Sequence, residues 1–594
     1  MKEFFRSLFA TLVGLVVFCG GCLVLLVLLL ASMGPSKPTV PARAVLILDL
    51  NTNFTDAYRE TSPAEVVQRM AGQGPAEGLP LHQVIQALDR ATHDGSVSAL
   101  FITGNLRPEG VGSGPAALKE LREAIQRFKK DSGKPVLAYN QYWTKRELYL
   151  CAGAGKVMAN PMGLVDATGF ASEITFFGKA FKKYGIDVQV TRAGKYKSAV
   201  EPFVLDRMSD ANREEVQSLL DDLWADWKRT VAADRKLSPE AVQAIADTQG
   251  TLTSPEALKA GLVDKLAAYD EVLDELKALA GKKASDRDYP QIDLATYVKA
   301  GPDAETGRNR IALVFAEGTI VDGSGTDGAV GGDALSREIR RLRLDKGVKA
   351  IVLRVNSPGG SVTASELIQR ELVLARKEKP VVVSMGHLAA SGGYWISCQA
   401  DRIFAEPTTI TGSIGVFGML PNIKALANEH GITWDGVQTS RLASAATLSR
   451  PKTPEELARA QGSVDWIYEV FLGKVAEGRK MSRDAVHEIA QGRVWSGAAA
   501  QRLGLVDELG GLQEAVRHAA KLAKVEKDYT LAGPAEPKSP IEKLMEALGG
   551  GKHPYTQARA GVLQQQVQRL FGQLETLNDP NGLYARMPYD LDLR

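Results

Sequence analysis

The chain has 594 residues, of which 44% are hydrophobic and 24% are charged, and this composition excludes a disordered, fibrous or wholly membrane-embedded protein. Its 72 basic and 70 acidic side chains leave a net charge of +2, so the sequence carries no electrostatic footprint for nucleic acid. Only four cysteines occur, two of them (Cys19 and Cys22) in an apolar run, and the soluble part has no CxxC or Cys/His cluster with metal spacing, so we expect neither a disulfide scaffold nor a zinc site.

An apolar segment opens the chain. No charged side chain occurs from Ser7 to Ser36, and a helix over Leu8–Met33 would be about 39 Å long, enough to cross a hydrocarbon core of about 30 Å. This stretch is longer than the apolar region of a cleavable signal peptide, and no cleavage site of small residues follows it. We therefore predict one uncleaved transmembrane helix within residues 1–43, preceded by a short cytoplasmic stub.

The rest of the chain contains an internal repeat. Short apolar segments typical of buried strands occur twice in the same order, spaced by 251 residues in one pair and by 246 in two later pairs. The paired segments are Ala44–Leu50 with Arg310–Phe315, Val97–Thr103 with Val348–Arg354, Lys134–Ala138 with Lys379–Val383, Ala159–Pro161 with Ala405–Pro407, Tyr184–Ile186 with His430–Ile432, and Ala260–Asp264 with Leu503–Asp507. The sequence therefore predicts two homologous halves.

Each half alternates strands with helices. Amphipathic stretches such as Leu118–Lys130 and Ala364–Lys377 separate the apolar strands, and buried strands joined by helices pair in parallel. We predict an α/β protein with one repeat over residues 44–300 and a second over 301–540. The connection lies in Lys282–Thr306, where two prolines interrupt any helix.

A separate tail follows the second repeat over residues 541–594. Apolar side chains share one face of a predicted helix over Thr556–Leu577, and a turn cluster follows at Asn578–Gly582. We interpret the tail as a packing or assembly arm.

The two halves differ where the second carries chemical groups. After its second strand comes Asn-Ser-Pro-Gly-Gly-Ser at Asn356–Ser361, whereas the counterpart Gly104–Gly110 lacks Pro-Gly-Gly. Two glycines after a strand expose backbone N–H groups as an oxyanion hole requires, although a simple tight turn has the same sequence. After the next strand, Ser391 stands between Ala-Ala and Gly-Gly at a strand-to-helix junction, which is typical of a nucleophile. Its counterpart at a spacing of 246 is Lys145.

A serine nucleophile needs a base. His387 is the nearest histidine in the sequence, but no Asp or Glu neighbours it, which disfavours a histidine triad. The first half instead contains Lys197 among small and apolar residues, and its counterpart in the second half is Ala443. An isolated lysine is commonly a solvated surface residue. The hypothesis of a Ser391/Lys197 dyad therefore depends on the complementary losses in the two halves, together with a resemblance to a known family.

Three motifs, Asn356–Gly360, Ala389–Tyr394 and Tyr196–Pro202, together resemble the signal peptide peptidase A family in its long, two-repeat form, also called protease IV. The resemblance covers nearly the whole chain. It implies tandem Clp-protease/crotonase-like domains and a homotetramer. It also implies a single-pass protein of the bacterial inner membrane, with its catalytic domain in the periplasm, that degrades signal-peptide remnants and other short or unfolded apolar peptides.

The resemblance also implies which residues form the site. The expected roles are nucleophile for Ser391, general base for Lys197, oxyanion hole for Gly359, Gly360 and the N–H of Gly392, and positioning of the lysine for Ser413. Peptide hydrolysis by such a dyad needs no metal, nucleotide or other cofactor.

Two rival functions stay open at this point. A crotonase-like acyl-thioester enzyme would also use an oxyanion hole after a Gly-Gly turn, but it predicts a soluble cytosolic protein with an Asp or Glu base. An inactive membrane-bound scaffold would use the duplicated halves for assembly alone. That reading does not explain why the halves differ at the nucleophile, the base and the oxyanion loop.

Overall fold

The computed structural model describes residues 14, 18, 37–57, 78–106, 114–301, 309–325, 328–533 and 583–587. Apart from residues 14 and 18, the predicted membrane helix lies outside these ranges, as does the predicted helix over residues 556–577. Within the described ranges, no helix combines the length and apolar character needed to span a bilayer.

The first half is built around a mainly parallel sheet. Its central strands, in spatial order, are β1 (Ala44–Asp49), β4 (Val97–Thr103), β5 (Val136–Trp143) and β6 (Lys156–Asp166). Side chains alternate between the faces, so Leu46 and Leu100 pack under α3 (Leu81–His93) and α4 (Pro115–Ser132), while Val45 and Phe101 pack on α11 (Tyr269–Leu279). The result is a sheet covered by helices on both faces.

The second half repeats this arrangement. Its central strands are β11 (Arg310–Glu317), β14 (Val348–Ser357) and β16 (Val381–Ala390), followed by β17 (Arg402–Ala405) and β18 (Ile410–Gly412), both paired with β16. The covering helices include α13 (Gly332–Leu344), α14 (Val362–Arg376) and α20 (Leu512–Leu522). The chain is therefore an α/β protein, as predicted, with two sheets of the same strand order.

The likeness of the two halves extends to local irregularities. The β1/β4 and β11/β14 registers both shift after the first residue of the pair. The long helices α8 (Asp210–Arg235) and α17 (Pro454–Arg479) both have 26 residues, and each ends at a lysine in the left-handed region, Lys236 at φ 56° and Lys480 at φ 55°. Register shifts and helix ends that recur at matching places in both halves indicate a duplicated unit.

The connection between the halves carries more structure than the sequence indicated. Residues 291–293 form β10 (Gln291–Asp293), which adds a parallel strand beside β1, and α12 (Leu294–Lys299) follows. Pro290 and Pro302 flank this strand–helix unit instead of breaking it, and the carbonyl of Pro290 accepts a hydrogen bond from Val45 N–H. In the second half, β22 (Thr530–Ala532) takes the same place beside β11.

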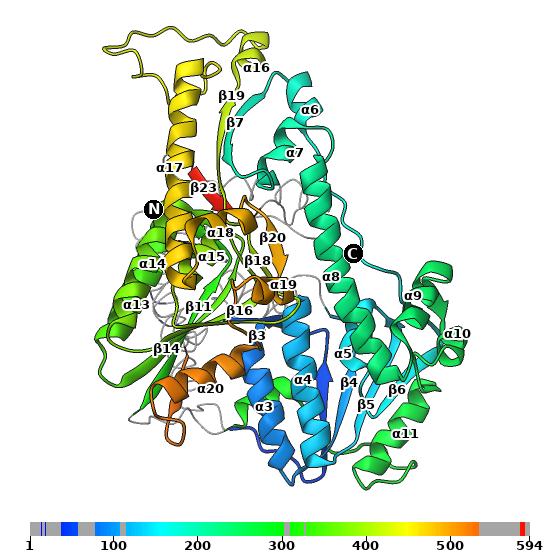
Figure 1. Cartoon of the computed structure of the whole chain (residues 1–594). Coiled ribbons are helices and arrows are strands. Elements are labelled where there is room, and N and C mark those ends of the chain that lie inside the picture. Colours follow the sequence, from blue (N-terminus) through cyan, green and yellow to red (C-terminus); the bar gives the residue numbers. More distant parts are fainter. Residues whose placement is uncertain are drawn as a thin grey trace, which may run out of the picture.

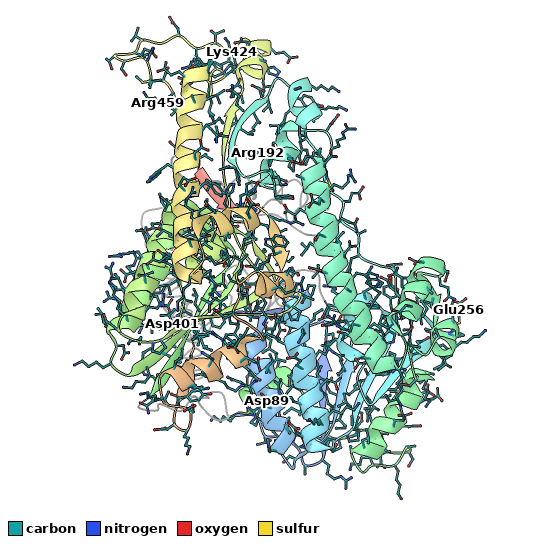
Figure 2. The ribbon with its side chains drawn as sticks, in the orientation of Figure 1. Asp89, Arg192, Glu256, Asp401, Lys424 and Arg459 are labelled. Carbon is teal, nitrogen blue, oxygen red and sulfur yellow. The ribbon has the colours of Figure 1, made fainter. Side chains whose placement is uncertain are left out.

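A third sheet joins the two halves. β7 (Asp187–Ala193) of the first half pairs antiparallel with β19 (Val416–Asn422) of the second over seven residue pairs, from Ala193–Val416 to Asp187–Asn422. These strands project from the body of the molecule together with the start of α17 and three short helices (Figure 1). The short helices are α6 (Gly178–Lys183), α7 (Glu201–Val204) and α16 (Lys424–Glu429). Figure 2 shows Lys424 and Arg459 near the tip of this projection and Arg192 on β7.

Candidate active site

Ser391 occupies a strained turn between β16 and α15 (Gly392–Ser397). Its backbone has φ 56° and ψ −112°, an unusual conformation for a residue with a side chain, which costs about 1 to 3 kcal/mol. Hydrogen bonds hold the turn, because Ser391 N–H donates to Gly412 C=O at 2.8 Å and Trp395 N–H donates to Ser391 C=O at 2.7 Å. A Cβ at Gly393 would lie 2.7 Å from Ser357 O, which explains a glycine at this position.

Lys197 reaches the site because β7 leads directly to it. After β7 the chain turns at Gly194, with φ 104°, where a Cβ would lie 2.3 Å from the backbone of Gln491. Tyr196 N–H then donates to Gln491 C=O at 2.9 Å. The loop that carries the lysine is therefore attached to the backbone of the second half.

The structure brings Lys197, Ser391 and Ser413 together. Lys197 Nζ lies within hydrogen-bond distance of three oxygens, at 2.7 Å from Ser391 Oγ, 2.9 Å from Ser413 Oγ and 3.1 Å from Ser413 O. All three side chains are fully buried. Ser413 also has a positive φ, of 51°, and its N–H donates to Arg493 C=O. The amine is thus held on one side by Ser413 and directed at the Ser391 hydroxyl on the other.

Burial lowers the pKa of this lysine. Removal from water holds the pKa of Lys197 well below its ordinary value of 10.5, and the nearby Glu215 carboxylate only partly opposes this effect. A neutral amine can accept a proton from a hydroxyl in contact with it. The arrangement is therefore suited to activating Ser391 for attack on a carbonyl.

The Pro-Gly-Gly loop lies next to the turn that carries Ser391. Gly359 has φ 95° and Gly360 has φ 157°, and a Cβ at Gly360 would lie 1.9 Å from Ile320 O. These glycines belong to β15 (Gly359–Ser361), which contacts α15. The Gly359 N–H donates to Ser357 Oγ at 3.1 Å in this structure, so that donor is engaged within its own loop.

A buried polar network fixes the base of the same loop. Asn356 Nδ2 donates to Asp56 Oδ2 at 2.6 Å, and Asn356 Oδ1 accepts from Leu388 N–H at 3.1 Å. Arg354 forms ion pairs with Asp56 at 3.1 Å and with Glu120 at 2.5 Å. Because Asp56 and Glu120 come from the first half, the loop is attached to both halves.

The counterpart positions lack this chemistry. In the first half Thr144 stands at the N-cap of α5 (Lys145–Cys151), the place that Ser391 takes before α15, so the structural counterpart is one residue before the expected Lys145. Lys145 itself binds Thr168 Oγ1 at 2.7 Å. Ala443 is exposed in a turn of the second half.

His387 does not act as a paired histidine here. Burial lowers its pKa to about 4, although Asp56 raises it in part. Among the residues that the structure describes, its Nδ1 has no hydrogen-bond partner.

Several residues that support the lysine loop were not assigned by sequence reasoning. Glu201 is buried and accepts hydrogen bonds from Ser209 Oγ at 2.6 Å and Asn212 Nδ2 at 2.9 Å, which attaches the loop to α8. Gly492 leaves room for Lys197, since a Cβ there would lie 2.7 Å from the lysine Cβ. The sequence offered a signal for Glu201, which is an acidic residue inside the Tyr196–Pro202 motif. It offered none for Gly492, which lies almost 300 residues from Lys197 in the chain.

A second contact between the halves surrounds the same loop. Arg493 donates to Glu214 at 2.9 Å and to Tyr196 Oη at 3.1 Å, and its guanidinium also lies over the Tyr196 ring. The charged partners come from different halves, so this cluster stabilises the lysine loop only in the assembled chain.

Comparison with protein families gives a match to the description "Peptidase family S49" over residues 128–283 and again over residues 374–526. The two matched segments together cover just over half of the chain, and one falls in each half.

Individual relatives extend the match to most of the chain. "Protease 4" of Salmonella typhi is 38% identical over 520 residues, 86% of this chain and 83% of its own length. "Protease 4" of Haemophilus influenzae is 34% identical over 96% of this chain and 95% of its own length. "Serine protease SPPA, chloroplastic" of Arabidopsis thaliana is 32% identical over 86% of this chain and 74% of its own length.

Among solved structures, a ClpP1 mutant from Listeria monocytogenes matches 34% of this chain and 94% of its own, with 16% identity and a TM-score of 0.24. A TM-score this low does not establish a common fold. The Clp-protease/crotonase-like fold therefore stays a prediction from the family resemblance.

Proposed function

The chain belongs to peptidase family S49 and is a serine protease, and from this premise we propose that Ser391 is its nucleophile and Lys197 its general base. The observation that carries the proposal is the 2.7 Å contact between Lys197 Nζ and Ser391 Oγ, with both side chains fully buried. The two groups come from different halves, so each half alone would be inactive.

The proposed reaction hydrolyses a peptide bond in two stages. Neutral Lys197 takes the proton of the Ser391 hydroxyl while Oγ attacks the substrate carbonyl carbon, and the protonated lysine then gives that proton to the leaving amine. Water, deprotonated by the same lysine, hydrolyses the acyl-enzyme and restores the serine. Ser413 keeps the amine in place through both stages, because it accepts two hydrogen bonds from Nζ.

Backbone N–H groups of Gly359, Gly360 and Gly392 are proposed to bind the oxyanion. Gly392 directly follows Ser391 at the start of α15, and the glycine strand β15 contacts that helix. Since Gly359 N–H donates to Ser357 Oγ in this structure, it would have to exchange or share that partner when the oxyanion forms.

Signal-peptide remnants and other short or unfolded apolar peptides are the proposed substrates. The apolar run Leu8–Met33 supports a single membrane anchor, and the few basic residues before it support a cytoplasmic N-terminus. With that orientation the catalytic halves would lie in the periplasm, beside the inner membrane where such remnants are released.

The reaction also distinguishes this function from its rivals. A serine-reactive fluorophosphonate probe is expected to modify Ser391 in the purified protein, with the adduct located by peptide mass spectrometry. Modification supports the protease over both an acyl-thioester enzyme and an inactive scaffold. A protein that hydrolyses peptides yet labels elsewhere would remove Ser391 from the mechanism.

The pH dependence of activity follows from the burial of Lys197. Because only the neutral amine acts as a base, kcat/KM is expected to rise with pH through one deprotonation whose midpoint lies below 10.5. A titration of the wild type and of His387→Ala by initial rates checks this. The midpoint should be the same in both, since His387, with a pKa of about 4, is already neutral where the rise occurs.

The same shift has a predictable sign for stability. Between the lowered pKa of Lys197 and 10.5 the unfolded chain binds a proton at this lysine that the folded chain does not. The contribution of Lys197 to the free energy of unfolding therefore increases with pH across this window. Denaturant titrations of the wild type and Lys197→Met should converge in their pH dependence above it.

A homotetramer is the proposed assembly, and the projection around β7 and β19 supports it. Large apolar side chains are exposed there, at Tyr184, Ile432, Trp434, Val437, Leu448 and Trp466. Apolar residues gathered on one exposed region are typical of an interface between subunits.

Light scattering of the soluble fragment that begins at Pro41 is expected to give about four chains per particle. Trp466→Asp should lower that mass, because it places a charge in the proposed interface. Leu522→Asp, also at an exposed apolar residue but on α20 in the body, should leave it unchanged. A fully active monomer in all three samples would refute the tetramer.

A further inference from the structure

A cavity lies along the seam between the two halves, apart from the proposed dyad. Its volume is about 450 Å³, within the range of about 300 to 1,000 Å³ that is typical of small-ligand pockets. Helices α3 and α4 of the first half form one side, and β11, β14, β22 and α20 of the second half form the other. Figure 1 shows α3 and α20 side by side, and Figure 2 labels Asp89 where they meet. Neither Ser391 nor Lys197 lines this cavity.

The apolar part of the wall comes from both halves. It consists of buried aliphatic side chains, namely Leu81 and Ile85 of α3, Leu313 of β11, and Leu512 and Val516 of α20. Such a wall suits a ligand with a branched aliphatic body.

The polar part of the wall is a buried cluster with more acid than base. Asp56 and Glu120 are 3% and 5% exposed, and both pair with Arg354, at 3.1 Å and 2.5 Å. Two carboxylates therefore share one guanidinium. Burial raises the pKa of the Glu120 carboxyl, an effect that Arg354 opposes and Asp56 increases. Because a buried negative charge without a partner is costly, a second cation would be stabilised at this cluster.

A neutral histidine adds a hydrogen-bond acceptor to the same wall. His82 of α3 lines the cavity, and burial lowers its pKa to about 4, although Asp56 partly opposes this shift. A neutral imidazole has one acceptor nitrogen, and His82 Nδ1 has no hydrogen-bond partner among the residues that the structure describes. The wall therefore combines negative charge with an acceptor for an N–H group.

The other two arginines of the lining are already engaged. Arg127 donates to Gln513 at 2.8 Å, and Gln513 in turn donates to Asp89 at 2.6 Å. Arg517 pairs with Glu514 on its own helix. The charge that a ligand would meet in the cavity is accordingly that of the buried carboxylates, which favours a cation over an anion.

We propose that this cavity binds the free amino terminus of a short apolar peptide, with the ammonium group beside Asp56 and Glu120. Hydrolysis of a peptide bond adds water across the carbon–nitrogen bond and leaves such an amino terminus on one of the two fragments. The ligand class is thus a product of the reaction, and in this respect the inference rests on the proposed function.

Asp56 couples the cavity to the oxyanion loop. Its Oδ2 accepts from Asn356 Nδ2 at 2.6 Å, and its Oδ1 accepts from Arg354 Nε at 3.2 Å. An ammonium group beside Asp56 would compete with Asn356 and Arg354 for these oxygens. Asn356 also accepts from the N–H of Leu388, three residues before Ser391. An occupied cavity should therefore loosen the loop and lower kcat, which is inhibition by product.

Leucyl-leucinamide and its N-acetyl form test the binding, because they share one apolar body and differ in the ammonium group. Isothermal titration calorimetry is carried out on the full-length protein after complete reaction with fluorophosphonate, so that the substrate site is blocked and the dipeptide is not cut. The free amine is expected to bind at one site per chain, at least about tenfold more tightly than the acetylated form. Equal affinities, or no binding of the free amine, overturn the proposal.

Three variants locate the site. Leu531→Trp places an indole in the cavity from β22 and should abolish binding of the amine, whereas Leu522→Trp, at an exposed position of α20 outside the lining, should not change it. Glu120→Gln keeps the side-chain shape and removes the charge, so the affinity for the amine should fall toward that of the acetylated form. Circular dichroism verifies the fold of each variant. Undiminished binding to a folded Leu531→Trp protein places the ligand elsewhere and refutes the site.

The kinetic consequence is measured on unlabelled enzyme with a fluorogenic peptide. Leucyl-leucinamide should lower kcat of the wild type and of Leu522→Trp, and Leu531→Trp should be insensitive. A rise in KM alone, equal in wild type and Leu531→Trp, would indicate competition in the substrate site and would contradict the coupling. If Ser391 is not labelled and no peptide is cleaved, the proposed function fails, while calorimetry on the same protein still decides whether the cavity binds the amine.

Discussion

The variant Ser391→Ala is expected to lose peptidase activity by several orders of magnitude, on the order of 10⁶-fold in kcat, because it removes the only atom that bonds to the substrate carbonyl carbon. The fold should be unaffected. The Ser391 side chain makes no helix-capping hydrogen bond, and Lys197 Nζ keeps both of its contacts with Ser413. Hydrolysis of a fluorogenic peptide by the pure variant, measured against the thermal unfolding midpoint, checks both statements.

A matched control is available on the same helix. Ser397 is equally buried, and its hydroxyl donates to Gly393 C=O at 2.6 Å instead of contacting the lysine. Ser397→Ala should cost about 1 kcal/mol of stability and leave kcat/KM near that of the wild type. Comparable losses of activity in both variants would mean that disturbance of α15, and not loss of the nucleophile, is responsible.

The second large effect is expected for Lys197→Arg. Guanidinium stays protonated at any accessible pH, and the larger side chain would have to fit where Lys197 is completely enclosed, so a loss of at least about 10²- to 10⁴-fold in kcat/KM is expected. Lys195→Arg, two residues earlier, should be tolerated because that lysine is exposed, with its amine over the Tyr196 ring.

The two large effects should not add. If the serine and the lysine act as one unit, the double variant Ser391→Ala/Lys197→Met should be no less active than Ser391→Ala alone. Progress curves for Ser391→Ala, Lys197→Met and the double variant, measured under one condition, decide this. Multiplicative losses would indicate that Lys197 supports activity by a route that does not involve the serine.

The organisation of the halves could be predicted from sequence because it depends on local pattern. Apolar strands such as Val97–Thr103 and Val348–Arg354 are buried on both faces and can pair only in parallel between helices, so their repetition already indicates two α/β units. The pairing of β10 with β1 was missed, since three residues, Gln291–Asp293, carry too little apolar periodicity to stand out between two prolines.

The site was predictable in its residue types but not in its geometry. Pro-Gly-Gly, a serine between small residues and one lysine are local features, and the loss of each from one half could be seen by comparing the halves. That Lys197 lies 2.7 Å from Ser391 could not be seen, because the contact depends on β7 pairing with β19 across more than 200 residues of chain. The position of β23 (Leu583–Arg586) has the same origin, since β23 pairs with strands over 160 residues away.

By itself, then, the sequence determined the strand pattern, the duplication and the chemical groups available, because these follow from side-chain identity and short-range periodicity. Only the tertiary structure decided the lowered pKa of Lys197, because burial causes it and residues of the second half, such as Ser413 and Gly492, lie against this first-half lysine. Desolvation and contact distances are properties of the packed chain: Gly492 and Arg493 affect the site solely because folding brings them next to residues that are remote in sequence.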